Sequence, residues 1–381
     1  MRDDFKEKLK AYSEGKLSEE ETLEVEKELE KMEVYQSYLD EQLDDETENR
    51  FQPNDQKIIR KGKWKARISN AVTAISILIL IAFCSSLVNS IFYSWGEPDR
   101  IEVYNDVIES AIAVTNPNIE VGSRGSNTGF FFFNNKSDLK KRIGNKNEKV
   151  GSFEMNFFYG FPFSPTIEKD IEQNSMFIYP VAENKNISDD HEWERLNHLP
   201  EGTVAEAYIS LDQLYSTKKL LSLLENYQTV KPAWFAVDTG IEKEEAKQRG
   251  PTPTDSIGFP SLPIWHPEDL EITSRETEDK GFYSNVTIEE GTYPNVSDYG
   301  SAELRNENFI RTLEIMNEHK RISNRVAQSS DLRLNKRMDY VKNHGVHIYG
   351  VVITGPSKEI LALRGEDWIS SLSIGEVRLW N

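Results

Sequence analysis

Residues 71–93 read AVTAISILILIAFCSSLVNSIFY, and none of these 23 residues is charged. At about 1.5 Å of rise per residue, such a helix is about 35 Å long, more than the roughly 30 Å hydrocarbon core of a bilayer. A buried core helix is the alternative, but core helices seldom run this far without a charge. A cleaved signal peptide fits less well, because its apolar region is shorter and lies nearer the N-terminus. We therefore predict one transmembrane helix, at residues 68–95.

The charges on either side of this stretch predict its direction. Residues 57–70 carry six basic side chains and no acidic one, whereas residues 94–107 carry one basic and four acidic side chains. Because Lys and Arg accumulate on cytoplasmic flanks, the N-terminus is expected in the cytoplasm and residues 96–381 outside the cell. The basic run could instead bind nucleic acid, but beside an apolar span, topology and anionic lipid explain it better. The expected location is the cell membrane, with a single pass and the lipid bilayer as a partner.

The composition excludes several classes of function. The chain has 381 residues, a net charge of −19 and a single cysteine. A broad nucleic-acid footprint needs clustered Lys and Arg, so no direct nucleic-acid partner is expected. One cysteine excludes a disulfide framework and a thiolate-rich zinc site, and we predict neither a metal nor a cofactor.

The segment before the span predicts two amphipathic helices. Residues 1–56 have a net charge of −11. The first helix covers Asp3 to about Glu14, and the second begins at Ser18, with Glu21 completing a capping box. Two short helices bury little apolar surface against each other, so their apolar faces are expected to need another partner. An acidic, half-disordered tail is the alternative.

The segment after the span alternates strands and helices. A helix is expected at 101–115, a strand at Thr128–Asn134 and a helix at Leu214–Tyr227. Residues 239–300 contain six prolines and many charges, and are expected to form a long insertion with weak strands at best. The predicted fold class is α+β: a small all-α cytoplasmic segment, one transmembrane helix and an exported mixed α/β domain.

No catalytic residue is predicted. Residues 137–140 and 216–219 both fit S-x-x-K, but the chain has neither of the partner motifs of acyl-enzymes. Residues 238–240 (DTG) match half of an aspartic-protease pair without a second copy, so a turn is expected there. His191 and His198 lack the spacing of a zinc-binding H-E-x-x-H helix and are expected on a surface helix.

Several short motifs resemble a known family. FKEKLKAY (5–12), GKLS (15–18) and LEKM (29–32) are similar to the N-terminal domain of bacterial anti-sigma factors. The C-terminal half resembles the sigma-regulator domain of membrane anti-sigma factors of bacilli, the anti-sigma-M type in particular, over about residues 196–381. The motifs that carry this second resemblance are LPEGTV (199–204), RMDYV (337–341), YGVVITGPSKEI (349–360) and GEVRLW (375–380).

The resemblance implies a function and partners. Residues 1–66 would be a cytoplasmic sigma-binding domain that sequesters an extracytoplasmic-function sigma factor, of the M type. The exported region would sense the state of the envelope or bind a partner, and an accessory membrane subunit is a further expected partner. Many relatives hold zinc through a His-x3-Cys-x2-Cys motif, but no His or Cys precedes Cys84, so this chain would be a zinc-free version without a thiol switch. The expected contacts with the sigma factor are the apolar residues Phe5, Leu9, Tyr12, Leu17, Val25, Leu29, Met32 and Leu39.

Two other functional classes stay open on the sequence alone. The chain could be an exported binding module or envelope enzyme held by an incidental anchor. It could also be a transmembrane scaffold with an acidic tail. Removing residues 1–50 would separate the exported module or enzyme from an anti-sigma factor, because only an anti-sigma factor would then release its target genes. Whether the isolated tail has a tight partner would separate the scaffold.

Overall fold

A computed structural model describes residues 2–50, 53–170, 177–181, 190–249, 256–279 and 285–380. The chain divides into two compact units, Met1–Ile81 and Ala82–Asn381, and each is described by itself. The boundary falls inside one long helix. Helices and strands are mixed along the chain, after an N-terminal part that is wholly helical, which confirms the predicted fold class.

The first unit begins with a helical hairpin of α1 (Arg2–Ser13) and α2 (Glu19–Arg50). Gly15 allows the turn, because its φ of +66° is costly for residues with a side chain. The predicted capping box is confirmed: the Glu21 backbone N–H donates to the Ser18 hydroxyl at 3.4 Å, and the Glu21 carboxylate accepts from the Ser18 N–H at 3.1 Å. The glycine turn and the capping box therefore determine where α2 begins.

The apolar stretch lies in α3 (Pro53–Tyr93). Its part from Gln56 to Tyr93 is long and apolar enough to cross a membrane, and almost none of its apolar window is buried inside the protein. That exposure disfavours the core-helix alternative, since a core helix would be covered by other elements.

The second unit continues with α4 (Arg100–Thr115) and a first antiparallel sheet. The Asp99 carboxylate caps α4 by accepting from the Glu102 N–H at 2.8 Å. The sheet has the path β1-β2-β3-β4, and β5 also pairs with β3. Its strands are β1 (Glu120–Thr128), β2 (Phe132–Ile143), β3 (Lys146–Phe158), β4 (Phe161–Pro162) and β5 (Thr166–Lys169).

The strand expected at Thr128–Asn134 is wrong. β1 ends at Thr128, the chain reverses over the next three residues, and β2 begins at Phe132. Gly129 donates its N–H to the Phe132 carbonyl at 2.8 Å, and Phe131 has a left-handed φ of 59°. The run of four phenylalanines favours a strand, but the left-handed backbone of Phe131 and the hydrogen bond from Gly129 to Phe132 place the first two phenylalanines in a tight reversal.

A second sheet forms the centre of the C-terminal part. Its strand order is β12-β6-β11-β7-β8, and every neighbouring pair is antiparallel. β11 is the central strand and β6 lies beside it, and both are buried on both faces over most of their length. The strands are β6 (Thr203–Ser216), β7 (Lys231–Val237), β8 (Gly258–Pro260), β11 (His347–Pro356) and β12 (Ile369–Leu379).

Seven helices among the described residues accompany this sheet and the segments around it. They are α5 (Asp190–His198), α6 (Thr217–Leu224), α7 (Ile241–Arg249), α8 (Ala302–Glu318), α9 (Lys320–Val326), α10 (Leu334–His344) and α11 (Ser357–Leu361). The helix expected at Leu214–Tyr227 is thus shorter, because β6 runs on to Ser216, whose hydroxyl caps α6 by accepting from the Lys219 N–H at 3.3 Å.

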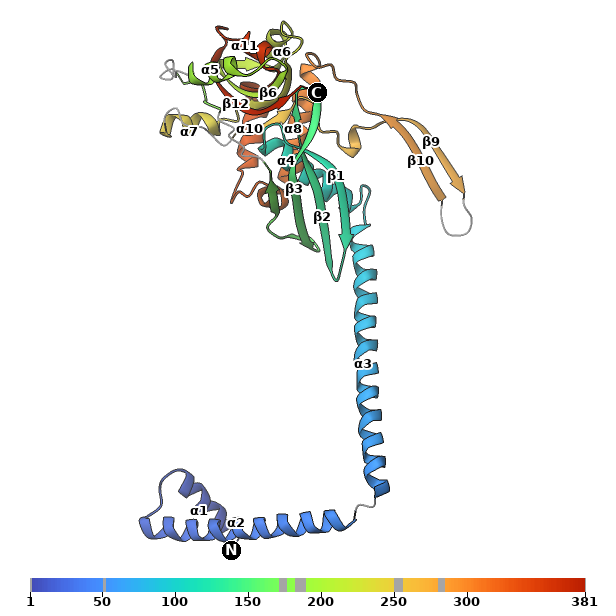
Figure 1. The fold of residues 1–381 in the computed structure, drawn as a ribbon, viewed down its shortest axis with the longest axis vertical. Coiled ribbons are helices and arrows are strands. Elements are labelled where there is room, and N and C mark those ends of the chain that lie inside the picture. The colour runs from blue at the N-terminus through green and yellow to red at the C-terminus, as the bar shows by residue number, and fades with distance from the viewer. Residues whose placement is uncertain are drawn as a thin grey trace. The chain divides into compact units, whose positions relative to one another are not determined.

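The described parts of residues 239–300 form more helices and strands than the sequence suggests. Besides α7, the segment supplies β8 to the second sheet, and β9 (Glu271–Asp279) pairs with β10 (Asn285–Thr292) in a separate two-stranded sheet. A short 3-10 helix (Pro267–Asp269) precedes β9. Figure 1 shows β9 and β10 as an arm that extends away from the two larger sheets.

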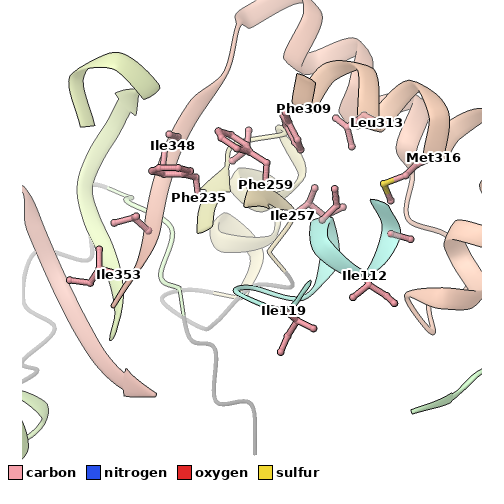
Figure 2. Close-up of a cluster of buried hydrophobic side chains, with 14 of the residues drawn as sticks. Ile112, Ile119, Phe235, Ile257, Phe259, Phe309, Leu313, Met316, Ile348 and Ile353 are labelled. Carbon is pink, nitrogen blue, oxygen red and sulfur yellow. The ribbon is translucent and has the colours of Figure 1, made fainter. Parts of the chain in front are cut away.

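The core joins the second sheet to the helices beside it. Phe259 lies between Phe235 and Phe309, with ring centroids 5.2 and 5.1 Å apart. Figure 2 shows these rings from β7, β8 and α8 beside Ile112 of α4. α4, which leaves the end of α3, is therefore packed into the same core as the C-terminal motifs.

Candidate functional site

The predicted contact residues fall into two groups in the helical hairpin. Val25 is only 2% exposed. Met32 and Leu39, by contrast, are 47% and 40% exposed. The rest are half-buried: Phe5, Leu9, Tyr12, Leu17 and Leu29. The structure therefore places most of the predicted residues in or next to the seam between α1 and α2, and leaves the last two open.

Polar contacts across the hairpin hold the seam in register. The Lys8 ammonium lies 3.2 Å from the Glu24 carboxylate, and the Tyr12 hydroxyl donates to Glu26 at 3.1 Å. This hydrogen bond, with the charge of Glu26, raises the pKa of Tyr12 above its ordinary value. Exposed pairs of this kind contribute little to stability, so they orient the hairpin more than they stabilise it.

Beyond the reach of α1, α2 presents an open apolar stripe. We define this α2 stripe as Met32, Tyr35, Tyr38 and Leu39, all of them exposed. Met32, Tyr35 and Leu39 follow one another at steps of three and four, so they share a face of the helix. The sequence prediction missed Tyr35 and Tyr38, although the same spacing was the signal that could have found them.

The stripe lies in a strongly acidic setting. Residues 1–56 carry a net charge of −11, and Glu19, Glu20 and Glu21 occupy the first turn of α2. Carboxylates there are stabilised by the positive end of the helix dipole. An apolar stripe with acidic surroundings suits a partner that combines an apolar groove with basic side chains.

In the second unit, a buried ion pair ties the two larger sheets together. The Lys141 ammonium of β2 lies 2.7 Å from the Glu206 carboxylate of β6, and both side chains are at most 1% exposed. The Asn118 amide also donates to Glu206, at 2.7 Å, and the Tyr208 hydroxyl donates to it at 3.1 Å. Burial, reinforced by the charge of Glu206, raises the pKa of Tyr208 well above its ordinary value.

The motifs considered for catalysis have structural roles. Asp238 accepts from the Gly240 N–H at 3.0 Å and from the Tyr340 hydroxyl at 2.9 Å, in the turn expected after the strand. Burial, and then this hydrogen bond, raise the pKa of Tyr340 to about 12. Ser216 is a helix cap, and Ser137 is buried and donates to Asn135 at 3.2 Å.

The histidines likewise show no metal-binding arrangement. The side chain of His191 is 88% exposed on the surface helix α5. His266, which the sequence did not single out, is buried between Asp106 and Thr312, with ring nitrogens 2.8 and 2.9 Å from their oxygens. Across the described residues, no group of three His, Cys, Asp or Glu side chains could hold a metal ion.

Three of the four C-terminal motifs meet at one pocket. Val204 of the first motif, Gly355 and Pro356 of the third, and Arg378–Trp380 of the fourth line it together with the β2–β3 turn. Leu379 and Trp380 are 71% and 56% exposed there. Sequence stretches far apart along the chain thus form one surface next to the junction of the two larger sheets.

Comparison with known protein families identifies the class of this chain. Residues 56–148 match the family model described as sigma factor regulator N-terminal, and residues 196–376 match the one described as sigma factor regulator C-terminal. The chain therefore belongs to the anti-sigma factors of bacilli, as the motifs indicated, and a sigma factor is the partner that this family implies.

One relative is similar to this chain over its whole length. The chain is 30% identical to the probable anti-sigma-M factor YhdL of Bacillus subtilis (strain 168), over 394 aligned positions that cover 100% of this chain and 99% of the relative. No solved structure matches this chain.

Proposed function

We propose that this chain is a single-pass membrane anti-sigma factor that sequesters an extracytoplasmic-function sigma factor of the M type. Residues 1–50 bind the sigma factor in the cytoplasm and hold it away from RNA polymerase. The observation that carries the proposal is the exposed α2 stripe on a hairpin whose inner residues are already covered.

The two groups of apolar residues have different tasks in this proposal. Val25 and Leu29 build the hairpin, together with Phe5, Leu9, Tyr12 and Leu17. Met32 and Leu39, with Tyr35 and Tyr38 beside them, contact the sigma factor directly. Burying one such side chain in a partner contributes about 1.5–3 kcal/mol, so these residues supply a substantial apolar share of the binding free energy.

Acidic residues around the stripe assist encounter and orientation. A sigma factor binds DNA and is basic where it does so, and the net charge of −11 over residues 1–56 attracts such a surface at long range. The effect weakens as salt rises, because the Debye length shortens to about 8 Å at physiological ionic strength.

The charge asymmetry around α3 supports the proposed topology. Six basic residues at 57–70 hold the N-terminal side in the cytoplasm, and the region from residue 96 is exported. There it senses the state of the envelope or binds a partner, for which the pocket formed by the C-terminal motifs is one candidate surface. An accessory membrane subunit is a further proposed partner, since a single helix needs another element to move against.

Deleting residues 2–50 tests this function against an exported binding module or enzyme. The deletion removes the proposed sigma-binding hairpin but keeps the basic run, the span and the exported region. We expect transcription from sigma-dependent promoters to rise at least tenfold, as measured by transcript sequencing, although the truncated chain still reaches the membrane. Unchanged transcripts, with the truncated chain present at its normal level, would favour the exported module.

A further inference from the structure

The first sheet ends in a cluster of exposed aromatic side chains. The β1–β2 and β3–β4 turns lie at the same end of the sheet, because Phe132 pairs with Phe158 and Phe158 pairs with Phe161. Phe130 and Phe161, the outermost of these residues, are 60% and 61% exposed. We define the aromatic tip as Phe130, Phe132, Phe158, Phe161 and Phe163.

The opposite face of this end of the sheet is packed on α3. Ser85, Asn89 and Tyr93 succeed one another at steps of four, so they share a face of the helix, and each is at most 2% exposed. The Tyr93 ring lies 5.2 Å from the ring of Phe133, whose side chain points away from the tip. The sheet end is therefore fixed to the last turns of α3, with its aromatic tip directed outward.

Two hydrogen bonds from α3 satisfy the backbone of the β1–β2 turn. The Asn89 amide donates to the Gly129 carbonyl at 2.6 Å, and the Ser85 hydroxyl accepts from the Phe131 N–H at 2.8 Å. A turn exposed to water would not need such partners. In hydrocarbon, however, an unpaired backbone group costs several kcal/mol, so irregular backbone occurs there only when protein groups bond to it.

These contacts lie within the apolar stretch itself. Ser85 precedes Tyr93 by eight residues, which is about 12 Å along a helix. If Tyr93 marks the membrane surface, the turn that bonds to Ser85 lies well below the level of the lipid headgroups. The helix surface around it is also open and apolar, with Leu87 and Ile91 52% and 55% exposed.

We propose that the aromatic tip is immersed in the outer leaflet of the bilayer, beside α3, and anchors the exported region to lipid. This inference rests on the proposed crossing of the membrane by α3. Aromatic side chains concentrate where protein meets the boundary between headgroups and acyl chains. The tip is continuous with the proposed span, so lipid is the occupant that covers both surfaces at once.

Basic side chains lie beside the aromatic tip, and they favour lipids with an anionic headgroup. α9 packs against β4 and carries Lys320, Arg321 and Arg325, all exposed, without an acidic residue of its own. The Arg321 guanidinium lies 5.3 Å from the centre of the Phe161 ring. A cationic row beside an apolar one matches the phosphate layer of anionic phospholipids.

An apolar groove along the end of α3 could also bind a phospholipid. Its lining residues are Val88, Ile91, Phe92, Trp95 and Arg100. The Arg100 guanidinium lies 4.3 Å from the centre of the Phe92 ring and donates to the Phe92 carbonyl at 2.6 Å. Such a groove accommodates an acyl chain, with a guanidinium near the level of the phosphate.

Site-specific fluorescence in vesicles tests the proposal on the full chain. Cysteines are introduced as Phe130→Cys, Phe161→Cys or Leu379→Cys, each with Cys84→Ser, and labelled with an environment-sensitive dye. Leu379 is a matched control, because it is an exposed apolar residue of the second sheet. The unsubstituted chain, labelled at its exposed Cys84 within the proposed span, reports the membrane crossing itself. The vesicles contain phosphatidylcholine and phosphatidylglycerol, with nitroxide-bearing lipid or aqueous iodide as quenchers.

We expect nitroxide lipid to quench the labels at 130, 161 and 84, and iodide to quench only the label at 379. Quenching of 130 and 161 by iodide, while Cys84 remains quenched by lipid, would overturn the immersion and leave the membrane crossing intact. A Cys84 label that lipid does not quench would overturn both. Labels at 130 and 161 shielded from both quenchers would mean that protein, such as a second copy of the chain, covers the tip instead of lipid.

Discussion

At the scale of single residues, the ion pair between Lys141 and Glu206 connects the two larger sheets of the second unit. Neither side chain can reach water, so each charge depends on the other and on the hydrogen bonds from Asn118 and Tyr208. Removing one partner of such a pair costs about 3–5 kcal/mol, because the other charge stays buried alone. The pair therefore links the first sheet, which contacts α3, to the sheet that carries the C-terminal motifs.

Lys141→Met should destabilise the second unit by about 3–5 kcal/mol, which corresponds to a drop of several degrees in the midpoint of thermal unfolding. The measurement is intrinsic fluorescence during heating of the full chain in detergent micelles. Lys149→Met is a matched control, since Lys149 and Asp138 also lie 2.7 Å apart but are 56% and 33% exposed. The control should change the unfolding midpoint far less, because exposed ion pairs contribute little to stability. Equal shifts of the unfolding midpoint in both variants would contradict the prediction, because they would show that burial does not make the Lys141 ion pair more important for stability.

At the scale of elements, the sequence predicted the two helices of the hairpin closely, but not their packing against each other. The capping box at Ser18, the glycine at 15 and the spacing of apolar residues are local signals, and local signals determine helix ends. The same spacing could not show that Val25 is buried and Met32 exposed, since both residues lie on the same face of α2. Their different exposure depends on where α1 ends along α2, which is a tertiary contact.

The sheet end was less predictable for a similar reason. Ser85 and Asn89 read as polar residues that a membrane helix tolerates, but their bonds reach a turn about forty residues further along the chain. Periodicity contains no information about such distant partners. The run of phenylalanines at 130–133 likewise reads as a strand until the reversal at Gly129 is known.

Replacing Met32 and Leu39 by aspartate should abolish repression while leaving the hairpin folded. Both side chains are exposed, so the charge costs the free protein little, but it must be desolvated in the complex. We expect a rise of at least tenfold in a reporter driven by the target promoter. Circular dichroism and hydrogen exchange of α1 and α2 should stay as in the unsubstituted chain.

Leu23→Asp provides the control for this pair of substitutions. Leu23 is 58% exposed on the same helix but lies nine residues from Met32, about 180° around it. Repression should therefore persist in this variant. Equal derepression by both changes would mean that the helix as a whole, and not the α2 stripe, determines binding.

At the scale of the whole molecule, the charges divide the chain into three parts. Residues 1–56 carry −11, residues 57–70 carry +6 and residues 94–381 carry −14. In the proposed function, the acidic hairpin attracts a basic partner, and the basic run holds the N-terminal side at the cytoplasmic face of the membrane. The family relationship covers both ends of this plan, since the aligned relative spans the whole chain.

The central claim is that the chain binds a sigma factor through residues 1–50. Its most direct test is to purify the tagged full chain from detergent-solubilised membranes of its native cells and to identify bound proteins by mass spectrometry. We predict that one extracytoplasmic-function sigma factor copurifies with the unsubstituted chain in near-equal amounts, and that it is lost from the Met32→Asp/Leu39→Asp variant. Recovery of the chain without any sigma factor, or with equal amounts from both forms, would contradict the claim.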